Sequence, residues 1–85
     1  MPELCRFDGI IIRMYGDDHN PPHFHAVYKN NDALITIDPI ALNEGSIDRK
    51  ALRKVLEWAS QHQSELHENW YRLNHDLPHY KIAPP

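Results

Sequence analysis

The residues best suited to chemistry are gathered between Asp17 and His25, in the order Asp-Asp-His-Asn-Pro-Pro-His-Phe-His. His23 and His25 are separated by one residue and follow a pair of prolines. On a strand, both imidazoles would project from the same face, about 6–7 Å apart. His19, Asp17 and Asp18 can reach the same point from the preceding loop. Imidazole nitrogens and carboxylate oxygens are ligands for divalent transition metals such as zinc, so the segment predicts a metal site.

The same two histidines also suit metal-free acid–base catalysis. Side-chain alternation places Arg6, Arg13 and Tyr15 on the face that carries His23 and His25. Cleavage of an RNA phosphodiester needs a base for the 2′-hydroxyl, an acid for the leaving oxygen and cations for the developing charge. These five side chains form a candidate catalytic set. In a third interpretation the segment has no chemical role, being a turn and a sheet surface covered by the C-terminal tail.

A second group of charged residues lies further along the chain: Arg49, Lys50, Arg53 and Lys54. On a helix these four cations share the side opposite the apolar stripe, near the N-terminus, where positive charge opposes the helix dipole. A phosphate-rich or acidic partner would account for them, and so would a solvated face on which Glu57 offsets Arg53.

The elements that must position these residues can be predicted from the pattern of the chain. Asp8-Gly9 separates two strand-like runs and predicts a tight hairpin. Strands are expected over residues 3–7, 10–15, 23–29 and 33–38, with Asn30 to Asp32 as a turn. Residues 39–45 are expected to form a connection that holds at most a short extended piece.

One long amphipathic helix is expected over residues 47–74, followed by a non-helical tail over 75–85. Ser46 is the expected N-cap, and either fraying or a bend is expected near residues 60–64. Seven apolar residues recur at helical spacing and form one core-facing stripe: Leu52, Val55, Leu56, Ala59, Leu66, Trp70 and Leu73.

The sequence therefore predicts a single α+β domain over residues 1–85, a four-stranded antiparallel β-meander packed on one long C-terminal helix. Alternation assigns the apolar sheet face to Cys5, Phe7, Ile10, Ile12 and Met14, joined by Phe24, Ala26 and Tyr28. His23 and His25 then point to the other face, away from the helix.

The composition limits the class of protein. Of 85 residues, 41% are hydrophobic and 25% are charged, which is typical of a globular domain. The net charge of −3 argues against a protein that coats nucleic acid. The longest aliphatic run, residues 10–12, is too short for a membrane span, and the first residues lack a secretory signal. With Cys5 as the single cysteine, a cytoplasmic location is expected.

Several segments resemble the bacterial family known as domain of unknown function 4160. The likeness rests on His19 to Ala26, Cys5 to Ile10, Glu44 to Ser46, Arg49 to Ala59 and Asn69-Trp70. Such proteins resemble components of toxin–antitoxin-like gene pairs and often occur beside a small partner of the helix-turn-helix type. The resemblance implies such a setting and assigns no catalytic residue.

Two functions are expected from these observations. The first is a toxin–antitoxin-type protein that acts on RNA through the outer sheet face, with a cognate small bacterial protein as partner. The second is a non-catalytic module that binds a protein partner, its histidines being structural or holding a metal. A homodimer is compatible with either, because a domain of this size buries little surface by itself.

Overall fold

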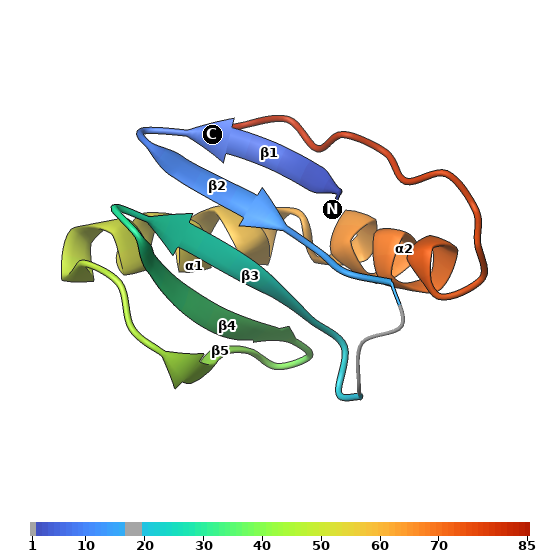
Figure 1. The fold of residues 1–85 in the computed structure, drawn as a ribbon, viewed down its shortest axis with the longest axis horizontal. Coiled ribbons are helices and arrows are strands. Elements are labelled where there is room, and N and C mark those ends of the chain that lie inside the picture. The colour runs from blue at the N-terminus through green and yellow to red at the C-terminus, as the bar shows by residue number, and fades with distance from the viewer. Residues whose placement is uncertain (1, 17–19) are drawn as a thin grey trace.

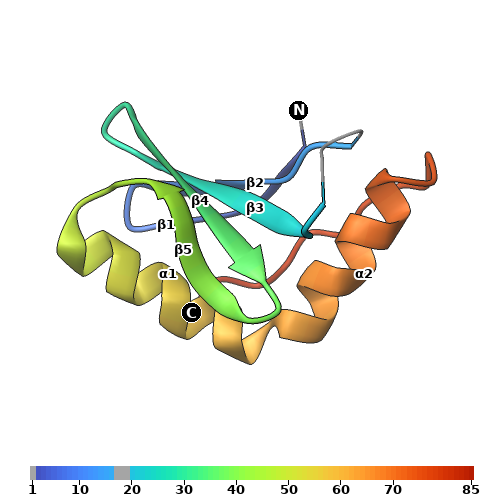
Figure 2. The same cartoon turned by 90° about the horizontal axis from the view of Figure 1, so that it is seen from below.

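The computed structural model describes residues 2–16 and 20–85. Within them, five antiparallel strands form one sheet in chain order, and two helices lie across one face of it (Figure 1 and Figure 2). The strands are β1 (Glu3–Phe7), β2 (Ile10–Arg13), β3 (His23–Tyr28), β4 (Asn31–Ile37) and β5 (Ile40–Gly45). The helices are α1 (Arg49–Gln61) and α2 (Gln63–Leu73). The expected α+β architecture with an antiparallel sheet is confirmed.

The first hairpin forms where the Asp-Gly pair predicts it. Asp8 and Gly9 adopt positive φ angles of 50° and 77°, and Phe7 pairs with Ile10 across the turn. The residues expected on the apolar face are all buried: Cys5, Phe7, Ile10, Ile12 and Met14. Leu4 is buried beside Cys5, because the register shifts between Glu3 and Cys5. Period-two alternation therefore predicts the core face of this hairpin.

The expectation of four strands is wrong, because residues 40–45 form a fifth. β5 pairs with β4 from Ile37↔Ile40 to Ala33↔Gly45. It is an edge strand, and after Ile40 all its residues are exposed. A strand that pairs on one side only and buries almost no side chain has no hydrophobic alternation by which a sequence could reveal it.

The expected turn at Asn30 to Asp32 is displaced. Lys29 and Asn30, with φ angles of 47° and 67°, form a two-residue turn between β3 and β4. This backbone geometry matches the twist of the flanking strands. Asp32 consequently lies within β4 and pairs with Val27, which brings its carboxylate onto the sheet surface.

The expectation of a single long helix is also wrong. The helix breaks at His62, within the region where fraying or a bend is expected. The His62 N–H donates to the Ala59 carbonyl at 3.0 Å, and its ψ of 23° leaves the helical range. The Gln63 side chain donates to the Ile37 carbonyl at 2.7 Å, which ties this corner to the end of β4. α2 therefore takes a new direction. No helix in the described part of the chain is long and apolar enough to cross a membrane.

The helix begins later than expected and with a different cap. Asp48, not Ser46, is the N-cap of α1, and its carboxylate accepts hydrogen bonds from the amides of Lys50 and Ala51. An aspartate there both satisfies unpaired amides and complements the dipole. Ser46 directly follows β5, which ends at Gly45, and so lies before the cap position.

The core lies between the sheet and the helices and is closed by the C-terminal tail. Trp58, which is 2% exposed, packs against Phe7 and Phe24 with ring centroids 5.7 and 6.1 Å away. Its indole N–H donates to the Ala83 carbonyl at 2.8 Å. The tail returns along β1 (Figure 1), where the Ile82 amide donates to the Leu4 carbonyl at 2.9 Å. One edge of the sheet is thus covered, and β5 forms the other.

Candidate functional site

The candidate site is centred on the two histidines at the start of β3. Phe24 between them is fully buried in the core, so His23 and His25 project from the opposite face of the sheet. Their ring centroids are 5.4 Å apart. The shared face that the His-x-His spacing predicts is therefore present, with the two rings in edge contact.

Hydrogen bonds at Nδ1 determine how the two imidazoles can act. His23 Nδ1 lies 2.8 Å from the Pro21 carbonyl oxygen, and His25 Nδ1 lies 3.1 Å from Asp32 Oδ1. Carbonyl and carboxylate oxygens accept hydrogen bonds only, so each Nδ1 must carry the hydrogen. In the neutral imidazole the lone pair then lies on Nε2. Nε2 is therefore the nitrogen that each ring would use in proton transfer or in coordination.

Two larger aromatic rings enclose the histidine pair. Tyr15 meets His25 edge-on at 4.8 Å between centroids, and the Trp70 ring lies 5.2 Å from His23. Figure 2 shows α2, which carries Trp70, rising past the end of the sheet where β3 begins. His23 is consequently only 5% exposed. The expectation that it points away from the helix is corrected by the new direction of α2.

Beside the histidines, the sheet surface is hollowed. One hollow of about 270 Å³ is lined by Asn20, Pro21, His23, His25, Leu34, Asn43 and Glu44. A second, of about 240 Å³, is lined by His25, Asp32, Leu34, Glu44 and Gly45. The two share His25, Leu34 and Glu44, so they are parts of one shallow surface. Carboxylates from β4 and β5 border it, and histidines from β3 form one wall.

The predicted cations are not equally placed. Arg13 pairs with His25 across β2 and β3, and residues paired in this way carry their side chains on the same face. Arg6 lies on β1, and its guanidinium binds Glu3 with an N–O distance of 2.8 Å. This hydrogen bond lowers the pKa of Glu3 and raises that of Arg6. Arg13 therefore lies beside the histidines, whereas the charge of Arg6 is engaged at the sheet edge.

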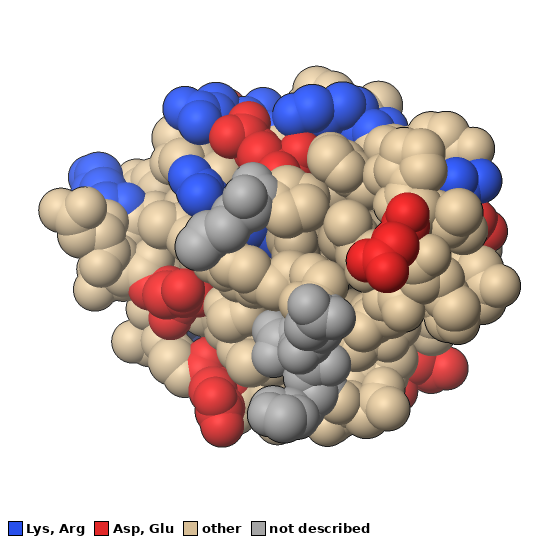
Figure 3. Space-filling model, turned by 45° about the vertical axis from the view of Figure 1, so that its right-hand side comes forward, with Lys and Arg blue, Asp and Glu red and all other residues tan. Residues whose placement is uncertain are grey.

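The surface around the site is mixed in charge. In Figure 3, lysine and arginine side chains gather along the upper margin, at the height of β1 in Figure 1, and carboxylates are spread below them. A ligand at this face would meet local positive charge near β1 and β2. It would not meet a uniformly basic surface.

The metal-site prediction falls partly on residues that are not described. His19, Asp17 and Asp18 lie outside the described residues, and within residues 2–16 and 20–85 no group of three potential ligands is assembled. The Nδ1 bonds of His23 and His25 nevertheless match those of metal-binding histidines, which usually donate the second ring N–H to a carbonyl or carboxylate. The two rings fit the ligand role for an ion such as zinc.

The second predicted cluster is remote from the histidines. Arg49, Lys50, Arg53 and Lys54 lie on α1, on the other side of the sheet from the outer face. All four are exposed, and the Lys54 ammonium pairs with Asp8 at 3.1 Å. The structure therefore brings His23, His25, Tyr15 and Arg13 together and leaves the helix cations as a separate surface.

Sequence reasoning missed several residues at the site. The sequence pattern places Asp32 in a turn and Trp70 in the core stripe, whereas in the structure Asp32 binds His25 and Trp70 covers His23. Asn43 and Glu44 belong to the unrecognised β5. Asn30 is a signal that could have located Asp32 on a strand, because asparagine readily adopts the positive φ that a two-residue turn requires.

The family model described as Domain of unknown function (DUF4160) matches residues 9–71. This range includes β2 to β5, α1, most of α2 and the histidine segment. No curated protein and no solved structure matches the chain significantly.

Proposed function

The chain belongs to the DUF4160 family, and from this premise we propose that it cleaves RNA with His23 and His25 as an acid–base pair. We further propose that it does so in the bacterial cytoplasm, as part of a toxin–antitoxin-type module. One observation carries the proposed chemistry. The two imidazoles are 5.4 Å apart, and each has Nδ1 bonded to an oxygen acceptor, so that Nε2 is the exchanging nitrogen of both.

The roles of the two histidines follow from their partners. His25 is the base that takes the 2′-hydroxyl proton, because the Asp32 carboxylate stabilises the imidazolium that this transfer creates. His23 is the acid that gives a proton to the leaving 5′-oxygen. Its Nδ1–H stays on the Pro21 carbonyl in both protonation states, so only Nε2 exchanges a proton.

The remaining side chains position the reaction and stabilise its charge. Arg13, paired with His25 across the sheet, would contact the phosphate oxygens as negative charge develops on them. Tyr15 holds the His25 ring by edge contact. The 2′-oxygen attacks phosphorus and the bond to the 5′-oxygen breaks, which yields a 2′,3′-cyclic phosphate and a 5′-hydroxyl. The histidines exchange their protonation states in the process.

The test is cleavage of a single-stranded RNA oligonucleotide in the presence of a chelator. We expect His25→Ala and His23→Asn each to lower the rate at least about 100-fold, the usual contribution of a general acid or base. Asparagine at position 23 retains a donor for the Pro21 carbonyl and so protects the buried site. His67→Ala is the matched control, because His67 is exposed on α2 and its Nε2 lies 3.9 Å from Asp38.

Asp32→Asn separates positioning from catalysis. It should lower kcat by about tenfold with little change in KM. Carboxylates that orient metal-binding histidines contribute roughly 10–100-fold, and Asp32, at 55% exposed, should be at the lower end of that range. Changed histidine tautomers in NMR spectra would accompany that loss. RNA cleavage at the wild-type rate by the double variant His23→Asn/His25→Ala would refute the proposed function.

A metal site is the second candidate, and the two Nδ1 bonds favour it. Elemental analysis of protein purified without chelator tests it, beside the double His23→Asn/His25→Ala variant. Near-stoichiometric zinc or another transition metal in the wild type, and none in the variant, would establish binding by these residues. Wild-type protein without metal that cleaves RNA in a chelator would leave the acid–base reaction as the function.

A further inference from the structure

A groove on α1, separate from the histidine site, has an apolar floor and a cationic rim. Its volume is about 370 Å³, and it is lined by Arg49, Lys50, Leu52, Arg53, Leu56 and Glu57. Every lining residue comes from this one helix. Leu52 and Leu56 are only partly buried, although both belong to the stripe that packs against the core.

Helix geometry explains why the groove exists. The row from Arg49 to Arg53 and the row from Leu52 to Leu56 are both spaced by four residues, and such rows form parallel ridges with a groove between them. The fully core-facing positions of α1, such as Val55 and Ala59, are completely buried. The two leucines therefore lie on the shoulder of the helix, where apolar surface meets solvent.

A further exposed apolar side chain lies at the open edge of the sheet. Leu42 on β5 is 40% exposed, and its register partner, Ile35, is fully buried on the helix side. Paired residues share a face, so Leu42 also points towards the helix layer. α1 contacts β5 directly, and Figure 2 shows the two side by side. Leu42 therefore adds exposed apolar surface on the edge strand that α1 contacts.

The charges on the rim are not neutralised by their neighbours. Among residues 2–16 and 20–85, no ion pair or side-chain hydrogen bond engages Arg49, Lys50 or Arg53. The first turn of α1 contains no acidic residue. The Asp48 cap complements the helix dipole, but within the described residues no carboxylate forms an ion pair with these three cations, although the chain has a net charge of −3.

We propose that this groove binds an acidic amphipathic helix of a partner protein. The partner would place apolar side chains on Leu52 and Leu56 and carboxylates against Arg49 and Arg53, the usual arrangement of a helix in a groove. An RNA backbone would use the cations but has no aliphatic side chains to bury on the leucines. The groove and the histidine site lie on different sides of the sheet, so the two can be occupied together.

The probe is a synthetic helical peptide of about 18 residues, long enough to populate a helix, with leucines along one face and glutamates beside them. A peptide of the same composition in scrambled order is its control. We expect the amphipathic peptide to shift NMR amide signals of residues 49–57. The Arg49→Glu/Arg53→Glu variant should bind it at least about tenfold more weakly. Lys29→Glu, which reverses an exposed charge at the β3–β4 turn, should bind it normally.

Other results would overturn the proposal. Equal binding of the scrambled peptide, or unchanged affinity after the double charge reversal, would show that the groove does not recognise an acidic amphipathic helix. A single-stranded RNA that displaces the peptide from residues 49–57 would replace the protein partner with a nucleic acid. A dimer in sedimentation experiments that dissociates on the double reversal would make a second copy of this chain the occupant.

Discussion

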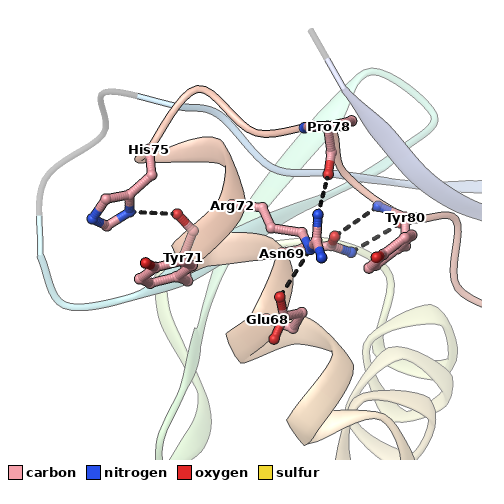
Figure 4. A network of polar contacts seen from close by, with 7 residues as sticks. All are labelled: Glu68, Asn69, Tyr71, Arg72, His75, Pro78 and Tyr80. Atoms are coloured by element: carbon pink, nitrogen blue, oxygen red, sulfur yellow. Dashed lines mark hydrogen bonds and ion pairs between the residues drawn. The ribbon is translucent and has the colours of Figure 1, made fainter.

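Replacing Asn69 with leucine should remove the main polar link between α2 and the C-terminal tail. Asn69 is 1% exposed, its Nδ2 donates to the Tyr80 carbonyl at 2.9 Å, and the Tyr80 amide donates to its Oδ1 at 2.8 Å. Figure 4 shows this pair of bonds beside Arg72, whose guanidinium lies 4.2 Å from the Tyr80 ring centroid. Leucine has the same branched arrangement of heavy atoms, so the change removes both hydrogen bonds while the shape of the side chain is largely kept.

The cost can be worked out from these contacts. Each lost hydrogen bond contributes about 1 kcal/mol net, and each backbone group left without a partner costs about 1–3 kcal/mol when buried. Both hydrogen bonds are only part-buried, so the lower end of this range applies. We therefore expect a loss of about 2–4 kcal/mol. For 85 residues the total free energy of unfolding is roughly 4–13 kcal/mol, so the loss is a large fraction of it.

Urea denaturation followed by circular dichroism measures this loss. Asn74→Ala is the matched control, because its Nδ2 donates to the Trp70 carbonyl at 2.8 Å on the exposed surface; it should cost less than about 1 kcal/mol. Hydrogen exchange of the Ile82 amide, which donates to Leu4, should accelerate in Asn69→Leu. A variant within about 0.5 kcal/mol of the wild type, with Ile82 still protected, would refute the reasoning.

Two further predictions concern the core and the sheet edge. Burial raises the pKa of the Cys5 thiol above its ordinary value of 9.0. The protonated thiol therefore contributes stability that is complete below pH 9.0 and is lost as the pH rises through the raised pKa. The urea midpoint should be lower at about pH 10 than near neutral pH, and this decrease should be smaller in Cys5→Ala. Gly45→Ala should cost more than about 1 kcal/mol in the same assay, because φ is 73° and a Cβ would collide with the Asp32 carbonyl oxygen. Gly9→Ala is its control, with the same sign of φ but only the Tyr28 ring nearby, and equal costs would contradict the collision argument.

The parts of the fold that the sequence predicts are those set by local chemistry. The Asp8-Gly9 turn requires positive φ, and alternation from Cys5 to Met14 selects a core face, so both could be predicted from adjacent residues. The break at His62 depends on the bond from Gln63 to the end of β4. That contact joins residues far apart in the chain, and helical spacing of apolar residues continues across it without interruption.

The same distinction holds at the candidate site. His23 and His25 share a face because strand side chains alternate, and this follows from their spacing alone. The contact with Asp32 depends on which two residues form the turn between β3 and β4. The contact with Trp70 depends on the direction of α2 after its break. Neither the position of this turn nor the direction of α2 can be inferred from the histidine segment, so Asp32 and Trp70 could not be predicted as partners of the histidines.

One irregularity in β5 decides what both surfaces contain. Strict alternation would put Leu42 and Glu44 on the same face, yet Leu42 pairs with buried Ile35 and Glu44 pairs with Leu34 on the histidine side. The register shift between Leu34 and Ile35 allows this, because an extra residue in a bulge reverses the direction of the side chains that follow. The bulge thereby places the aliphatic side chain of Leu42 on the helix side of the sheet and the carboxylate of Glu44 at the histidine hollow. Without it, Leu42 and Glu44 would lie on the same face, and one of the two surfaces would lose its side chain.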